Sequence, residues 1–154
     1  GFSPDSPVVL EKMPLPDISR AALVNPQEDR QQALGNNYEL RSGRMGNAGS
    51  NQELHKKQRQ TELDENQMFA SLETLGDQIR SCQAEWEAAC AKEQAQRAVW
   101  QSAVRKRELG TMAEGEYLEI YSQYMEEKGN QAQASIRFLL AMEEYDWAKK
   151  GLMD

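Results

Sequence analysis

The residues that could do chemistry in this chain of 154 residues are few and scattered. Nucleophilic catalysis needs a nucleophile and a base within hydrogen-bond reach. His55 is the single histidine, and the basic residues around it predict a solvated surface position. Cys82 and Cys90 lie on one predicted helix, about 12 Å apart by helical rise, too far for a disulfide between them. Cys82 is therefore expected to be a small core residue, with a disulfide between chains as the alternative.

The abundant glutamates raise the question of a di-metal carboxylate site of the kind that helical bundles hold. Such a site needs a Glu-x-x-His pair on a core face, and His55 has no partner set at the right spacing. The pairs Glu126-Glu127 and Glu143-Glu144 are typical of solvated helix faces. There is also no glycine-rich phosphate loop. The sequence therefore predicts a protein that is not an enzyme, with no catalytic residue, no metal site and no cofactor.

Composition and charge narrow the class of partner. The net charge is −7 and the isoelectric point is near 4.9, which argues against nucleic acid and against anionic membrane surfaces. No apolar run approaches the roughly 18 residues that a membrane-spanning helix needs. Gln, Glu, Ala and Arg are abundant, a composition typical of coiled coils. The expected partners are proteins, with no nucleic acid and no direct membrane span.

A short turn between two long helical stretches is the most informative feature. Gly110 suits the left-handed conformation that closes a helix, and Thr111 with Glu114 matches a capping box that opens the next one. Basic residues precede the turn and acidic residues follow it, the signs that the two helix dipoles favour. The stretch predicts the tip of a helical hairpin. The residues expected to contact a partner there are Arg105, Arg107, Leu109, Gly110, Thr111 and Glu114.

The charges of this tip allow two interpretations. In the first, the turn docks a partner protein, because the backbone is approachable at Gly110 and Arg107 offers a bidentate fork. In the second, the charges only complement the helix ends and pair across the turn with Glu114 and Glu116. The sequence leaves both open.

Helical stretches of very different length must position the tip. Residues 1–24 predict an extended, proline-rich arm, because four prolines exclude a helix there. Either Val8 to Leu10 lie along the helices, or the stretch is a disordered leader. Residues 25–154 predict one helical domain. Asn25 before Pro26 marks the start of a first helix, and Ser50 with Glu53 marks the start of a second. The expected helices are 25–44, 51–109 and 111–150; the second spans about 85–90 Å.

The apolar residues of the second helix follow heptad spacing, which implies supercoiling against a partner helix. Its predicted seam consists of Met68, Leu72, Leu75, Ile79, Cys82, Trp86 and Ala89. Beyond it Glu93 and Gln96 occupy seam positions, before Trp100 and Ala103 restore the apolar pattern. The facing stripe in the third helix is predicted to be Leu118, Tyr121, Met125, Ala132, Ile136, Leu139, Met142 and Trp147.

The helix lengths favour an all-α, elongated antiparallel coiled-coil rod. The first helix (short) and the third (medium) together cover about the length of the second (very long). Short connections make antiparallel neighbours the expectation. The sequence therefore predicts a helical hairpin in which the first and third helices lie end to end against the second. A rod this thin buries little apolar area, so self-association through the remaining apolar faces is expected.

Three helical phrases stand in a characteristic order along residues 20–150. They are Ala33-Leu34-Gly35-Asn36-Asn37-Tyr38-Glu39-Leu40, the stretch from Arg105 to Leu118, and Ala141-Met142-Glu143-Glu144-Tyr145-Asp146-Trp147-Ala148. This order resembles the helical repeat of TolC-type outer-membrane efflux proteins: a short helix, a β-hairpin, a long helix, a Leu-Gly turn and a returning helix. Where that family has its β-hairpin, this chain has only Gly46 to Ser50. It also carries one repeat where family members have two.

The resemblance implies a TolC-like extracytoplasmic module of an efflux or export system. Its tip would dock a partner of the adaptor or membrane-fusion type. This localisation assumes that a signal peptide was trimmed ahead of Gly1. The alternative is a coiled-coil scaffold or interaction protein with no transport role.

Overall fold

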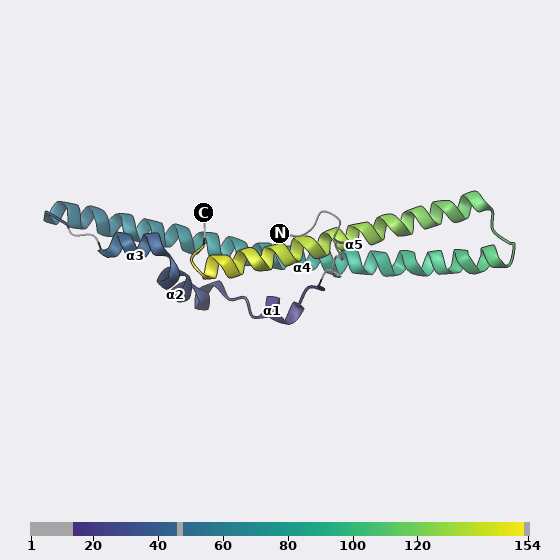
Figure 1. The fold of residues 1–154 in the computed structure, drawn as a ribbon, viewed down its shortest axis with the longest axis horizontal. Helices are drawn as coiled ribbons and strands as arrows, with labels where there is room; N and C mark the ends of the chain where they lie inside the picture. The colour runs from purple at the N-terminus through teal and green to yellow at the C-terminus, as the bar shows by residue number, and fades with distance from the viewer. Residues whose placement is uncertain (1–13, 46–47, 153–154) are drawn as a thin grey trace, which may run out of the picture.

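The computed structural model describes residues 14–45 and 48–152, and this part of the chain is helical with no β-strand (Figure 1). The all-α class predicted from the sequence is confirmed. Residues 1–13, with the predicted contact of Val8 to Leu10, lie outside the described ranges. The helices are α1 (Ile18–Ala22), α2 (Pro26–Asn36), α3 (Tyr38–Met45), α4 (Asn51–Glu108) and α5 (Glu114–Lys149).

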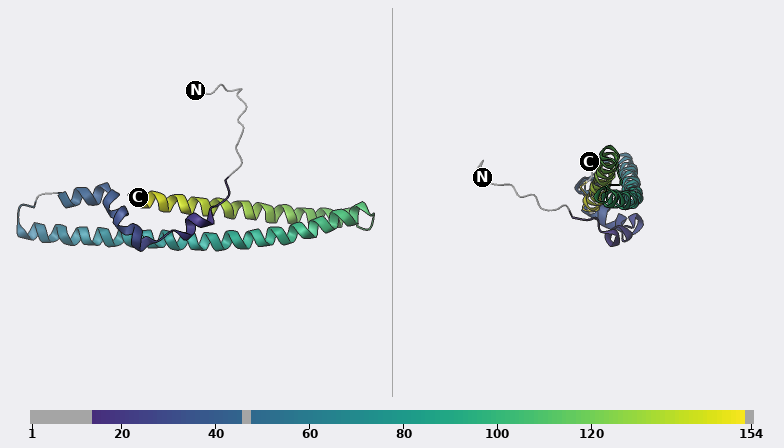
Figure 2. Two further views of the ribbon diagram at one scale, coloured as in Figure 1. Left: turned by 90° about the horizontal axis from the view of Figure 1, so that it is seen from below. Right: turned by 90° about the vertical axis from the view of Figure 1, so that its right-hand side faces the viewer.

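An antiparallel hairpin of α4 and α5 forms the body of the molecule (Figures 1 and 2). Ser50 caps α4, since its side chain accepts a hydrogen bond from the backbone N–H of Glu53, as the sequence predicted. The 58 residues of α4 span about 87 Å by helical rise. Because α5 has only 36 residues, it covers the part of α4 nearer the tip.

The predicted seam of α4 is confirmed, and so is its continuation through the predicted seam position of Glu93. Leu72 and Ile79 are fully buried. The alternating spacing of three and four residues then runs through Glu93, which is 7% exposed. The carboxylate of Glu93 is 2.7 Å from the Nη2 atom of Arg97, one turn later on the same helix. The seam therefore contains a polar layer between two apolar sections.

The predicted stripe of α5 is wrong in register. Leu118, Tyr121, Met125, Ile136 and Trp147 are 40–54% exposed, and of the predicted residues only Met142 is buried. The residues that face α4 form an uninterrupted heptad pattern shifted to a neighbouring face, namely Tyr117, Ile120, Tyr124, Glu127, Gln131, Ala134, Phe138, Ala141, Tyr145 and Ala148. This seam combines aromatic rings with alanines, because small residues let the helices approach and leave room for large rings. The prediction for α5 was wrong because it followed the most strongly aliphatic residues, and most of these lie on a more exposed face of the helix.

The single helix predicted for residues 25–44 is also wrong, because the chain bends at Asn37. The Asn37 side chain accepts a hydrogen bond from the backbone N–H of Leu40 at 3.0 Å. Such a local bond offers the backbone an alternative to continuing the helix. The predicted start is confirmed: Asn25 caps α2, with Pro26 in the first turn. Both α2 and α3 pack against α4, and α2 also contacts α5.

The end of α5 lies against the junction of α2 and α3. Gly151 has φ +80°, and a Cβ atom there would lie 2.5 Å from the carbonyl carbon of Asn36. The side chain of Asn36 donates a hydrogen bond to the backbone oxygen of Lys149 at 3.1 Å. Only glycine fits this close approach without strain.

The arm predicted as extended over residues 1–24 contains a short helix, α1, in its described part. The helix begins at Ile18, two residues after Pro16, the last proline of the arm. Asp17 caps it by accepting hydrogen bonds from the backbone N–H of Ser19 at 2.9 Å and from the Ser19 hydroxyl at 2.6 Å. These bonds lower the pKa of the Asp17 carboxyl.

Candidate functional site

The candidate site is the turn that joins α4 to α5 at one end of the hairpin (Figure 1). Gly110 adopts φ +69°, the left-handed conformation predicted for it. The backbone N–H of Thr111 donates to the carbonyl of Lys106, and that of Gly110 donates to the carbonyl of Arg107, both at 2.9 Å. These two bonds close α4 with a Schellman motif. These bonds therefore give the turn a well-defined backbone conformation.

The predicted capping box of Thr111 and Glu114 does not form. The Thr111 hydroxyl donates backward to the carbonyl of Lys106 at 3.0 Å, so it helps to end α4 rather than to begin α5. Ala113 occupies the N-cap position of α5 without a side-chain bond. The left-handed turn at Gly110 directs Thr111 toward the preceding helix, which a sequence motif cannot indicate.

Arg107 and Glu114 are the two predicted site residues whose side chains the fold brings together. Nη2 of Arg107 lies 2.9 Å from Oε1 of Glu114 across the turn. The guanidinium carbon of Arg107 also lies 4.3 Å from the ring centroid of Tyr117, a cation–π geometry. Both charged groups are about half exposed, so the pair is open to solvent and to a partner.

The other predicted tip residues leave an accessible surface. Leu109 is 77% exposed at the point where α4 ends. A Cβ atom added at Gly110 would meet nothing within 4 Å, so the backbone there can be approached. Arg105 and Glu116 are exposed, and within the described residues neither forms an ion pair. The tip thus combines an exposed apolar side chain, an open backbone and a charged pair.

An aromatic layer between α4 and α5, at the tip end of the hairpin, was not predicted from the sequence. The rings of Trp100 and Tyr124 stack with centroids 4.9 Å apart and an interplanar angle of 2°. The ring centroids of Tyr121 and Trp100 are 6.1 Å apart, and those of Tyr117 and Tyr121, which stack, are 6.5 Å apart. Aromatic pairs of this kind add stability beyond their buried area, so the layer fixes α5 against α4 just before the tip. The signal was present in the seven-residue spacing from Tyr117 to Tyr124.

The residues considered for catalysis or metal binding, namely His55, Cys82 and Cys90, lie apart from the tip and from one another. His55 is exposed near the start of α4. Cys82 and Cys90 are both free thiols and partly buried. Burial raises the pKa of the Cys82 thiol, with the nearby Glu85 carboxylate adding to the effect, which lowers its thiolate fraction and its reactivity. Cys82 has the seam position that the sequence predicted.

Within residues 14–45 and 48–152, no group of three or more His, Cys, Asp or Glu side chains is arranged to hold a metal ion. In the same ranges, no helix is long and apolar enough to cross a membrane. Comparison of the chain with protein-family models, with curated proteins and with solved structures finds no match.

Proposed function

We propose that this chain is a TolC-like, non-enzymatic helical module outside the cytoplasm, part of an efflux or export system. It docks a protein partner of the adaptor or membrane-fusion type through the turn between α4 and α5. The observation that carries the proposal is the exposure of Leu109 beside the open backbone of Gly110, at the end of a long hairpin. The order of helical phrases along the chain, which resembles that of the TolC family, supplies the class of system.

The rigidity of the turn supports recognition at this place. The backbone bonds that close α4 hold the turn, and the Trp100–Tyr124 stack fixes the two helices below it. A binding surface that is already ordered loses little conformational entropy when a partner docks. Leu109 offers the apolar contact, and the Arg107–Glu114 pair offers charges of both signs at its edge.

A second candidate function is a coiled-coil scaffold with no transport role. One observation favours it: Arg107 already has a carboxylate and an aromatic ring as partners within the chain. In that case the charges at the tip only stabilise the turn, and the long coiled coil of α4 and α5 carries the scaffold function.

Site-specific photo-crosslinking in cells of the source organism separates the two functions. A photoreactive residue replaces Leu109 at the tip; in a matched control it replaces Leu63, which is 62% exposed on α4 before the part that α5 covers. The proposal expects an adaptor-type envelope protein, identified by mass spectrometry, from the tip position alone. Arg107→Ala should weaken that crosslink while the helical content stays unchanged. Equal products from both positions, or none from the tip, would refute docking through the turn.

A further inference from the structure

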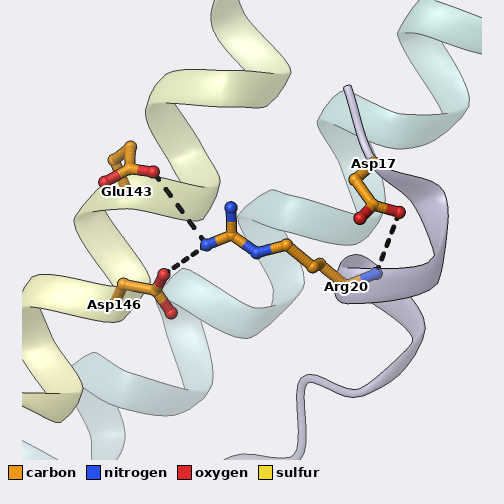
Figure 3. Close-up of polar contacts among 4 residues, drawn as sticks. All are labelled: Asp17, Arg20, Glu143 and Asp146. Carbon is orange, nitrogen blue, oxygen red and sulfur yellow. Dashed lines mark hydrogen bonds and ion pairs between the residues drawn. The ribbon is translucent and has the colours of Figure 1, made fainter. Parts of the chain in front are cut away.

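Residues 14–36, with α1, the turn after it and α2, form a strap along one side of the hairpin (Figures 1 and 2). Its first attachment is a single arginine. Nη2 of Arg20 lies 2.5 Å from Oδ2 of Asp146 and 4.0 Å from Oε1 of Glu143, both on α5 (Figure 3). Arg20 follows Asp17, the residue that caps α1, so the cap and the ion pairs hold the same short helix.

The second attachment is Asp29 on α2. The hydroxyl of Tyr145 donates to Oδ2 of Asp29 at 2.8 Å. Nζ of Lys149 lies 2.6 Å from Oδ1 of the same carboxylate. Both attachments therefore join the strap to the last turns of α5, within a short stretch of that helix.

The apolar contacts of the strap come from small or partly buried side chains, since Val24 and Leu34 pack against the core without being fully buried. Its buried apolar side chains include Ala21 and Ala33, whereas Leu15 and Leu23 are 77% and 80% exposed. Because hydrophobic stabilisation scales with buried area, this arrangement contributes less than the fully buried side chains of the seam. The side chains of Arg20 and Asp146 are 50% and 37% exposed, so salt screens their attraction.

A glycine of α4 makes room for the strap. A Cβ atom at Gly76 would lie 2.9 Å from Cγ of Pro26 and 3.8 Å from Cγ1 of Val24. The proline ring is tied to the backbone and cannot move aside alone. The strap therefore fits α4 only because residue 76 has no side chain.

The hairpin also has packing between α4 and α5 themselves, and this packing continues past the strap toward the tip. Phe138 is fully buried and lies 5.9 Å from the ring of Trp86. The stack of Trp100 and Tyr124 lies still nearer the tip. Elements with few buried contacts open locally at lower free energy than the core they cover.

We propose that the strap is a latch that opens as a unit, at a free-energy cost below that of unfolding the seam, while the α4–α5 hairpin remains folded. Opening exposes the side of the hairpin around Gly76, which the strap otherwise occupies as an intramolecular ligand. Ionic strength and the charge at residue 20 change the fraction of open molecules, because the ion pairs to α5 are part of the attachment.

Hydrogen exchange of the full chain, measured by mass spectrometry at low and high salt, tests the latch. Arg20→Ala removes the ion pairs to Glu143 and Asp146. Gly76→Ala places a methyl group in steric conflict with the ring of Pro26. Arg137→Ala is the matched control, since Arg137 pairs with Glu85 at 3.9 Å and is similarly exposed but does not contact the strap. The removal of exposed ion pairs should speed exchange of the strap amides by about two- to tenfold.

If the strap is a latch, its amides should exchange faster in Arg20→Ala, and in wild type at high salt, than in wild type at low salt. The amides in the seam of α4 and α5 should be equally protected in all samples. Gly76→Ala is the decisive variant. Alanine favours the helical backbone over glycine, so the hairpin should be no less stable, yet the strap should exchange faster. Strap exchange unchanged by both variants and by salt overturns the proposal. So does a strap that exchanges only together with the hairpin, or an equal response in Arg137→Ala.

Discussion

Truncation of Phe138 tests which face of α5 forms the core. Phe138 is fully buried, and its ring lies 5.9 Å from that of Trp86. Removing a buried phenylalanine side chain typically costs about 3–5 kcal/mol, from lost transfer free energy and the cavity left behind. At a slope of about 2 kcal/mol per molar urea, Phe138→Ala should lower the unfolding midpoint by about 2 M. Far-UV circular dichroism and tryptophan fluorescence follow the transition.

Ile136→Ala is the matched control, because Ile136 belongs to the stripe predicted from sequence but is 45% exposed. A substitution at such a position should change the free energy of unfolding by less than about 1 kcal/mol, and alanine's higher helix propensity offsets part of that. If Ile136→Ala costs as much as Phe138→Ala, the seam observed in the structure is wrong and the register predicted from sequence is right.

Three further predictions concern the tip, the strap and the polar layer of the seam. Gly110→Val should destabilise the hairpin by about 1–2 kcal/mol, because its backbone has φ +69°; an unchanged melting temperature would mean that the turn does not need this conformation. Burial raises the pKa of the Tyr145 phenol, and its hydrogen bond to Asp29 adds to the effect. The folded state thus holds this proton more tightly, so the stabilisation is complete below the ordinary pKa of about 10 and is lost as pH rises above it. Wild type should lose stability above pH ~10 more steeply than Tyr145→Phe, and parallel pH profiles would contradict this. Glu93→Leu should raise the free energy of unfolding by about 1 kcal/mol, since the apolar seam gains a hydrocarbon while its partner Arg97, 51% exposed, can be solvated alone; a loss of stability in urea titrations would show that this layer is needed for packing.

Local signals in the sequence were sufficient to predict the starts of α2 and α4 and the glycine turn at the tip. Ser50 and Asn25 cap helices because their side chains satisfy backbone N–H groups of the first turn. Gly110 closes α4 because the left-handed conformation costs glycine little. These effects act over a few residues, so their physical cause is contained in the local sequence. The seam of α4 was also predictable, because its apolar residues repeat at heptad spacing.

The tertiary structure decided what depends on residues far apart in the chain. Two stripes of α5 are apolar, and only the fit of Phe138 and the alanines against α4 selects between them, because packing depends on the shape of both surfaces. Thr111 turns back to α4 because the left-handed residue before it directs the chain. Arg20 finds its partners 123 and 126 positions away on α5, as Glu143 and Asp146. Caps, the glycine turn and heptad spacing determined the two long helices, because these signals are local. Contact between helices determined which face of α5 is buried and where the charges pair.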